Sequence, residues 1–448
     1  MTVRDIDPSV REPADMRKVT LAGGLGTLIE YYDYALYGYV SAIIAPLFFP
    51  NQDPVAALLS VLALFALSYV IRPLGGIYFG WVGDRFGRKR ALLVTIIGIG
   101  VASTIIGLLP TYATVGVLAP ILLFVVRIAQ GFFAGGEVGG AATVIAEAAP
   151  NGRKSRYAAF VPMGTNAGFA VASAAIGVVS GLLAADQLNS WGWRIPFLLA
   201  APLTVICYFA RRTLPDIDRN VKKASHGFPL LSALKSYPGP LAQATALGIG
   251  VQGAAYIGST FIAIYLVTNL DYPKAPVYWI TAGVTVFSVA LMPFTGRLAD
   301  RIGPITVAVI GLVGYAVVTY PALLLMDLGS LGFAALGYAL IMVNMAFLQV
   351  ASYTITPQLF DDEVRYTGTA LATNISVVIA GGTAPYIATW LVSRTDNLRS
   401  PYLFVALTSV IGLISVLTIW RYRRHGLEHD TSARSAAAAK GGKSSPVA

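Results

Sequence analysis

A charged turn reads GWVGDRFGRKR at residues 80–90 and returns as GRLADRIG at residues 296–303. Both copies place an Asp-Arg step four residues after a glycine, and Asp300 follows Asp84 by 216 residues, about half of the 448-residue chain. Each copy lies between two apolar segments long enough to span a bilayer. A repeat in register at this distance indicates a chain built from two related halves.

Composition places most side chains in lipid. Of the 448 residues, 56% are hydrophobic and 12% are charged, whereas roughly 25% of a soluble chain is charged. The apolar residues form runs of about 20, the length that a helix needs to cross a hydrocarbon core of about 30 Å. We therefore expect an all-α integral membrane protein with twelve transmembrane helices in two six-helix bundles. The predicted spans are 20–49, 56–82, 90–109, 117–148, 156–184, 193–212, 240–269, 276–296, 304–325, 331–356, 366–392 and 401–421.

Basic residues predict the orientation of these spans. Lys and Arg gather at the ends of the chain and in alternate loops, and the longest polar stretch runs from Arg211 to Pro238. Loops that carry an excess of Lys and Arg stay in the cytoplasm. We expect a multi-pass protein of the bacterial inner membrane with both termini cytoplasmic. The N-terminus is polar and charged up to Thr20, so no cleavable signal peptide is expected.

The same pattern gives the expected parts of the chain. They are a cytoplasmic N-terminal segment (1–19), an N-terminal six-helix bundle (20–212), a cytoplasmic linker (213–239), a C-terminal six-helix bundle (240–422) and a cytoplasmic tail (423–448). The tail is rich in Ala, Ser, Lys and Gly and has no apolar heptads, so we expect it to be disordered.

Several classes of function are excluded by what the sequence lacks. There is one cysteine, Cys207, and the three histidines fall in polar segments, which excludes disulfides and Cys/His metal sites. The basic residues are scattered, without the interleaved aromatics of a nucleic-acid surface. No phosphate-binding Gly-x-x-x-x-Gly-Lys-Ser/Thr loop and no nucleophilic triad occur, so neither ATP nor another cofactor is expected, and the chain is not predicted to be an enzyme.

Several motifs resemble those of the major facilitator superfamily. The turn at 80–90 is similar to the pattern that this superfamily carries between spans two and three. Further stretches resemble its metabolite:proton symporter family: IEYYDYALYG at 29–38, RPLGG at 72–76, RIAQGFFAGGEVGG at 127–140 and WRIPF at 193–197. Tyr31-Tyr32 stands where members commonly have a tryptophan, and Pro304 stands where the first turn has Arg88. The resemblance implies import of a small metabolite with protons, such as α-ketoglutarate, citrate, shikimate, proline or betaine, and a gating role for the charged turn.

Charged side chains inside the spans are the candidates for function. A charge at the bilayer centre costs at least about 2.5–3.5 kcal/mol, so it persists only when it is paired or hydrated. The candidates are Glu30 and Asp33 in the first span, Arg72 in the second, and Arg127 and Glu137 in the fourth. The helical rise places Asp33 and Arg127 near mid-bilayer, where we expect them to face one another across a cavity.

Each charged candidate has a predicted role. We predict that Asp33 carries the proton, with Glu30 and Glu137 as alternative carriers, and that Arg127 is its counter-charge and the anchor for a substrate carboxylate. An anionic solute that competes for Arg127 would favour protonation of the acid. The alternative is a set of fixed ion pairs that hold spans one and four together. Arg72 lies within about two turns of the cytoplasmic loop and can snorkel, so gating or anchoring is expected for it at least as much as substrate contact.

Other polar residues and glycines complete the predicted site. The candidates for substrate binding beside Arg127 are Tyr34, Tyr37, Gln130, Gln252, Tyr256, Asn344, Tyr353 and Asn374. For those in the C-terminal half, an interhelical hydrogen bond is the alternative. The candidates for gating are Arg72, Asp84, Arg85, Arg88, Asp300 and Arg301. Glycines at small-x-x-x-small spacing in the fourth span predict close helix packing; they are Gly131, Gly135, Gly136, Gly139 and Gly140.

The sequence as a whole predicts a proton-coupled symporter that imports a small organic acid or zwitterion by alternating access and acts as a monomer in the bilayer. The first rival is an exporter or drug/proton antiporter of the same fold, which would be expected to present an unpaired acid to a cationic ligand. The second rival is a membrane sensor, which would need a regulatory domain that the short tail does not supply.

Overall fold

A computed structural model describes residues 13–50, 53–86, 88–136, 152–212, 237–361 and 364–441. Within these residues, eleven helices are long and apolar enough to cross a membrane. The first helix, α1 (Pro13–Phe48), has 36 residues and carries Glu30 and Asp33 in its apolar part, and it completes a set of twelve. The chain is therefore an all-helical membrane protein, as its apolar runs predict.

The helices form two bundles of six spans. The N-terminal bundle consists of α1, α2 (Pro54–Phe86), α3 (Arg88–Leu108), α5 (Leu118–Gly135), α7 with α8 (Lys154–Ala158, Phe160–Leu182), and α10 with α11 (Arg194–Leu198, Ala200–Arg212). The C-terminal bundle consists of α13, η2 and α14 (Pro238–Tyr256, Ile257–Phe261, Ile262–Thr268), α15 (Lys274–Ile302), α16 (Pro304–Met326), α17 with η3 (Leu331–Ile355, Thr356–Leu359), α18, η4 and α19 (Arg365–Ser376, Val377–Gly381, Ala384–Thr395), and α20 (Pro401–Gly441). The short elements α4 (Tyr112–Val115), α9 (Ala185–Gln187) and η1 (Leu188–Gly192) lie in the connections.

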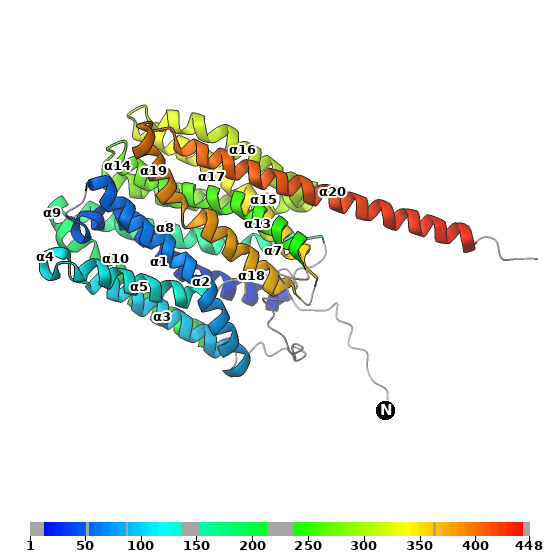
Figure 1. The fold of residues 1–448 in the computed structure, drawn as a ribbon, viewed down its shortest axis with the longest axis horizontal. Coiled ribbons are helices and arrows are strands. Elements are labelled where there is room, and N and C mark those ends of the chain that lie inside the picture. Colours follow the sequence, from blue (N-terminus) through cyan, green and yellow to red (C-terminus); the bar gives the residue numbers. More distant parts are fainter. Residues whose placement is uncertain are drawn as a thin grey trace, which may run out of the picture.

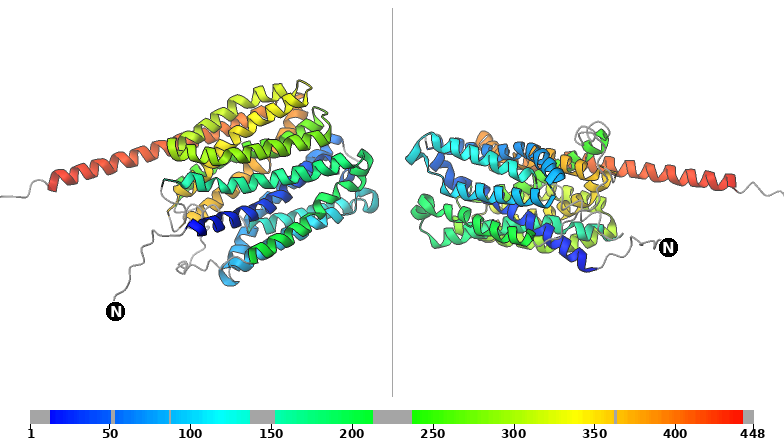
Figure 2. Two further views of the ribbon diagram at one scale, coloured as in Figure 1. Left: turned by 180° about the vertical axis from the view of Figure 1, so that it is seen from behind. Right: turned by 90° about the horizontal axis from the view of Figure 1, so that it is seen from below.

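The helices lie side by side along their length, with the N-terminal half on one side and the C-terminal half on the other (Figures 1 and 2). The helix α1 begins at the end of the bundle from which α20 projects, and we call this end the terminal face. The opposite end, with the connection between α1 and α2, is the loop face. Packing within the halves joins α1 to α8, α2 to α5, α13 to α20 and α16 to α17, and the halves meet where α8 packs along α15.

Two spans of the C-terminal bundle change pitch midway. The elements η2 and η4 are π-helical turns of five residues each, and such turns are frequent at functional sites. The turn η2 packs against α1 of the other half, where Thr260 contacts Gly38 so closely that a Cβ at Gly38 would overlap its methyl group. A change of pitch thus lies on the surface between the halves.

The helices differ from the predicted spans mainly at their ends. α1 begins at Pro13, and α15 runs to Ile302, because the second charged turn stays helical until Gly303 leaves the helix at φ +90°. α5 ends at Gly135, and residues 137–148 of the predicted fourth span lie outside the described residues. The predicted disorder after residue 422 must be corrected up to Gly441, where α20 ends. Four consecutive alanines precede this end, and alanine is the strongest helix former.

Glycines bring α2 and α5 into backbone contact. A Cβ at each would overlap a carbonyl oxygen of the facing helix: Gly75 with Phe132, Gly131 with Ser68, and Gly135 with Arg72. The close packing predicted for Gly131 and Gly135 is confirmed, whereas Gly139 and Gly140 lie outside the described residues. This contact fixes the turn of α2 that carries Arg72 against α5.

Replacing Gly135 by alanine is expected to disrupt this contact. The added methyl group meets a backbone oxygen that cannot turn aside, and overpacking of this kind costs about 1–3 kcal/mol. We expect a lower midpoint of thermal unfolding and less folded protein in size-exclusion chromatography. Gly283→Ala in α15 is the matched control, because a Cβ there meets nothing within 4 Å. Equal stability of the two variants would contradict the packing described for α2 and α5.

Candidate functional site

A cavity lies between the two halves, toward the terminal face. The space open to the centre of a water molecule is about 70 Å³, several times the roughly 10–15 Å³ that one water needs. Its walls come from α1 and α8 on one side and from α13, α17 and α18 on the other. Glu30, Tyr31, Gln252 and Tyr353 line it, together with several serine and threonine hydroxyls. The cavity therefore presents several polar groups within a largely apolar wall, and it has room for a small solute.

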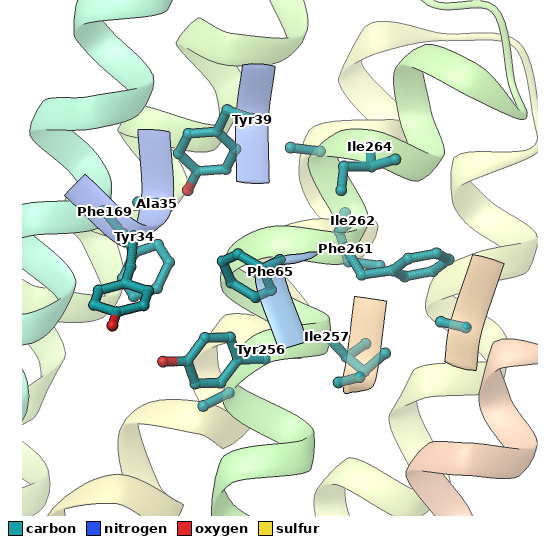
Figure 3. Close-up of a cluster of buried hydrophobic side chains, with 14 of the residues drawn as sticks. Tyr34, Ala35, Tyr39, Phe65, Phe169, Tyr256, Ile257, Phe261, Ile262 and Ile264 are labelled. Carbon is teal, nitrogen blue, oxygen red and sulfur yellow. The ribbon is translucent and has the colours of Figure 1, made fainter. Parts of the chain in front are cut away.

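The halves are in contact on the loop-face side of this cavity. The Tyr39 hydroxyl donates to the Ser259 carbonyl at 2.6 Å, and the Tyr278 hydroxyl donates to the Tyr39 carbonyl at 2.9 Å. Figure 3 shows Phe65 and Tyr256, from opposite halves, next to each other, and their ring centroids lie 6.2 Å apart. The conformation is therefore closed toward the loop face and hollow toward the terminal face.

A buried ion pair borders the cavity. Glu30 lines the cavity, and its carboxylate pairs with the guanidinium group of Arg72 on α2. Both side chains are buried, at 3% and 2% exposure, so neither reaches bulk solvent. The Cζ atom of Arg72 also lies 5.3 Å from the ring centroid of Tyr69. The prediction that Arg72 snorkels toward the cytoplasmic loop is therefore wrong, because Glu30 offers a charge partner inside the bundle.

Asp33 and Arg127 are enclosed within the N-terminal bundle. Asp33 is fully buried, and neither of its carboxylate oxygens has a hydrogen-bond partner in the described part of the chain. Ser103 and Arg127 are the polar groups whose electrostatic influence on this carboxyl is largest, although neither is bonded to it. The Arg127 guanidinium donates to the Gln130 side chain and, at 2.9 Å, to the Ser68 hydroxyl. Asp33 and Arg127 lie within the same bundle without forming an ion pair among the described contacts, and they do not face one another across the cavity as expected, because neither lines it.

The other candidates of the N-terminal half surround Arg127. Its Cζ atom lies 3.9 Å from the ring centroid of Tyr37 and 5.5 Å from that of Tyr34. The Gln130 amide donates to the Ser103 hydroxyl at 2.7 Å, so Gln130 connects Arg127 with the neighbour of Asp33. None of the four residues Arg127, Tyr34, Tyr37 and Gln130 lines the cavity in this conformation, and their predicted contact with substrate stays a prediction.

The candidates of the C-terminal half divide into two groups. Gln252 and Tyr353 line the cavity as predicted. The Tyr256 hydroxyl lies 2.7 Å from the Tyr69 hydroxyl and thereby joins the halves, and Arg72 stacks on the same Tyr69 ring. Tyr256 therefore contacts the ion-pair region without lining the cavity.

Asn344 and Asn374 do not reach the cavity. Asn344 packs against Gly314 of α16, and its amide donates to the Leu340 carbonyl at 2.9 Å. Asn374 is absent from the cavity wall, whereas its neighbour Thr373 lines it. Neither residue lines the cavity in this conformation, and their predicted contact with substrate stays a prediction.

The second copy of the charged turn joins the halves at the terminal face. The Asp300 carboxylate accepts the backbone N–H groups of Ser155 at 2.9 Å and Arg156 at 3.3 Å, where α7 begins. Gly296, one turn earlier, packs against the same backbone, and a Cβ there would lie 3.0 Å from the Arg156 Cα. A carboxylate at the start of a helix is stabilised by free N–H groups and by the helix dipole. Asp300 thus lies where a gate between the halves would act.

The remaining candidates for gating make fewer contacts. Arg85 and Arg301 are exposed, and the Cζ atom of Arg85 lies 5.5 Å from the Trp81 ring of its own helix. The side chains of Asp84 and Arg88 lie outside the described residues, as does Glu137, the third predicted proton carrier.

Replacing Asp300 by alanine is expected to loosen the terminal face. Losing such a cap costs typically about 1 kcal/mol, which shifts an equilibrium by about fivefold. The rate of thiol labelling of Thr165→Cys, at the cavity wall, should rise accordingly in a Cys207→Ala background. Asp361→Ala is the control, because Asp361 is exposed and accepts only the Tyr237 hydroxyl, at 3.0 Å, among the described contacts. An unchanged labelling rate would exclude a gating role for Asp300.

Sequence reasoning missed most of the cavity wall. Much of its polarity comes from hydroxyls such as those of Thr165, Ser352 and Thr373. A hydroxyl in an apolar helix commonly donates to a backbone carbonyl of its own helix, as Thr373 does to Thr369 at 2.8 Å. Such a residue can therefore lie on any face of the helix, and its type does not show whether that face lines the cavity. Tyr31 did carry a signal, because it stands where the resembled family has a tryptophan.

Comparison with known proteins agrees with this architecture. The family model described as Major Facilitator Superfamily matches residues 24–273 and 244–446. The chain is 32% identical over 449 residues to the proline/betaine transporter of Escherichia coli (strain K12), covering 97% of this chain and 89% of that protein. It is 33% identical over 426 residues to an inner membrane metabolite transport protein of the same organism, covering 92% and 95%.

Solved structures show the same fold. The proton:xylose symporter XylE bound to 6-bromo-6-deoxy-D-glucose superimposes with a TM-score of 0.68, covering 92% of this chain and 96% of that chain. At 17% identity this likeness concerns the fold alone. With near full-length similarity to transporters and with the two-bundle fold, the chain belongs to the Major Facilitator Superfamily, in its metabolite:proton symporter family.

Proposed function

We propose that this protein imports a small zwitterion or organic acid together with protons, by alternating access. The observation that carries the proposal is the buried Glu30–Arg72 pair, whose Glu30 lines the cavity between the halves. A buried ion pair is retained at a cost in desolvation, and charged groups inside membrane spans mark substrate and ion pathways. The relatives named for proline and betaine support the same class of solute.

A zwitterion suits this pair better than a simple anion. Its carboxylate can replace Glu30 on Arg72 while its cationic end meets the Glu30 carboxylate, so no unpaired charge remains buried. Tyr31 and Tyr353 line the same cavity and offer aromatic faces to an ammonium group. An organic anion would need a proton on Glu30 to reach the same balance, so the proposed preference is for zwitterions.

The proton is proposed to reside on Asp33. An ionised carboxylate without hydrogen bonds is costly to bury, so the environment of Asp33 suits a carboxyl group that carries a proton. Arg127 supplies the charge that compensates Asp33 after the proton has left. Glu30, which borders the cavity, is the second candidate carrier, and Arg127 and Arg72 are proposed to act as counter-charges for the two acids.

The terminal face is proposed to be cytoplasmic, in the bacterial inner membrane. Arg153, Lys154, Arg301 and Arg365 all lie near this end of the bundle, and basic loops stay inside. The relative named as an inner membrane protein supports the same location. The cavity would then be the compartment from which the solute leaves for the cytoplasm.

Uptake into proteoliposomes tests this function. Purified protein is reconstituted and given radiolabelled glycine betaine, L-proline, α-ketoglutarate or shikimate, with and without an inward proton gradient. We expect at least one zwitterion to accumulate above its external concentration only when the gradient is present. Accumulation of dicarboxylates alone would overturn the proposed zwitterion preference, and equal accumulation without a gradient would overturn proton coupling.

A further inference from the structure

We infer that Tyr34 is the positioning residue that links solute binding at Arg72 to the proton on Asp33. This inference rests on the proposed function, and it changes the role of Tyr34 from the substrate contact predicted by sequence to a relay between two arginines. The Cζ atoms of Arg72 and Arg127 lie 5.0 Å and 5.5 Å from the centroid of the same Tyr34 ring. Two cations from two helices thus share one aromatic side chain on a third.

The ring, and not the hydroxyl, makes this connection. Tyr34 is fully buried, and its hydroxyl has no hydrogen-bond partner in the described part of the chain. Its ring lies 4.7 Å from that of Tyr69, which holds it in place beside Arg72. Since a cation over an aromatic face is attracted by the ring quadrupole, both guanidinium groups draw on the same ring while they repel each other.

The position of one arginine therefore sets the position of the other. With the cavity empty, Arg72 pairs with Glu30 and stays at the Tyr34 ring. A solute carboxylate draws Arg72 toward the cavity. Arg127 is then the only one of the two arginines that contacts the Tyr34 ring, and it keeps its contact with Tyr37 as well.

This movement has a definite sign. Arg127 held by the rings does not turn to Asp33, so Asp33 keeps its proton while solute is bound. When the solute leaves, Arg72 returns to the Tyr34 ring, as in this structure, and its repulsion weakens the hold of the rings on Arg127. Arg127 still lies over the Tyr37 ring in this arrangement, and its later turn toward Asp33 is the proposed step that releases the proton. Solute and proton are thereby bound together and released together, and coupling of this kind is reciprocal by thermodynamic necessity.

The alternative is that Tyr34 only fills space in the N-terminal bundle. A packing role predicts that every change of this side chain lowers exchange and proton movement in the same proportion. A relay predicts that proton movement falls while solute exchange is retained. The ratio of protons to solute is therefore the deciding quantity, because a loss of folded protein lowers both terms without changing their ratio.

The test compares two variants with the wild type in proteoliposomes. Exchange of [14C]glycine betaine and of L-proline without a gradient reports binding and alternating access, and an entrapped pH dye reports solute-induced proton entry. Tyr34→Phe keeps the ring and is expected to keep the wild-type ratio of protons to solute. Tyr34→Leu is expected to retain exchange while that ratio falls at least about fivefold, the lower end of typical coupling between sites.

Matched controls separate this result from misfolding. Tyr32→Leu removes an equally buried tyrosine of the same helix, whose hydroxyl donates to the Pro196 carbonyl, and should leave the ratio unchanged. Tyr34→Met repeats the loss of the ring with another side chain of similar length. The inference is overturned if Tyr34→Leu keeps the wild-type ratio, if Tyr34→Phe loses it equally, or if the Leu and Met variants both lose exchange. Failure of the proposed function looks different, since the wild type itself would then move no protons.

Discussion

Arg72→Gln is expected to abolish solute accumulation and to destabilise the protein. The change leaves the Glu30 carboxylate buried without its partner, and breaking a buried pair from one side costs about 3–5 kcal/mol. That energy corresponds to more than about 100-fold in an equilibrium constant. Thermal unfolding of the purified variant and uptake of glycine betaine into proteoliposomes measure the two effects.

A double variant separates charge from packing in this experiment. Glu30→Gln with Arg72→Gln removes both charges and keeps two side chains able to hydrogen-bond. We expect it to recover most of the lost stability, because an uncompensated charge no longer remains, and to stay inactive in proton-driven uptake. Additive destabilisation by the two single changes would show that the pair is not energetically coupled.

Asp33→Asn is expected to uncouple solute movement from protons. The amide has nearly the same shape as the carboxyl group but cannot carry the proton. Solute exchange without a gradient should therefore persist, while the internal solute concentration should no longer exceed the external one. Asp53→Asn is the matched control, since Asp53 lies at the loop face and accepts the N–H of Val55 at 2.9 Å, a role that asparagine fills equally well. Full proton-driven uptake by Asp33→Asn would exclude Asp33 and leave Glu30 as carrier.

The fold was accessible from sequence because each span is a local pattern. A run of about 20 apolar residues requires a membrane-spanning helix regardless of its neighbours, and the charged turn at Asp84 with its copy at Asp300 fixed the register of the two halves. The ends were less predictable, as shown by α20, which continues to Gly441. In that segment the helix propensity of alanine favours a helix, whereas the polarity of the tail favours disorder.

The site was only partly predictable. The sequence shows how deep a residue lies along its helix, but it does not show toward which neighbouring helix its side chain points. Counting residues placed Asp33 and Arg127 at a similar depth, and both are buried inside the N-terminal bundle. It could not show that Glu30, three residues earlier on α1, is the acid that borders the cavity. Nor could it show that Arg72 turns inward to pair with Glu30.

Rotation about the helix axis depends on the partner helices. Gly131 and Gly135 draw α5 against α2 until backbone meets backbone, which sets the side on which Arg72 emerges. Asn344 illustrates the same limit, since its polarity suggested a cavity position and the packing of α17 on α16 turned it to Gly314. Such details follow from contacts between spans that are far apart in the sequence.

Solute-induced proton entry is the most direct test of the central claim. Proteoliposomes containing the wild-type protein and an entrapped pH dye receive glycine betaine or L-proline from outside, with the membrane potential clamped at zero. We predict acidification of the lumen that stops when the solute is omitted, and accumulation of up to about tenfold for each pH unit imposed, because a pH unit is worth about 1.4 kcal/mol. Solute entry with no change in internal pH, or with alkalinisation, would contradict proton symport.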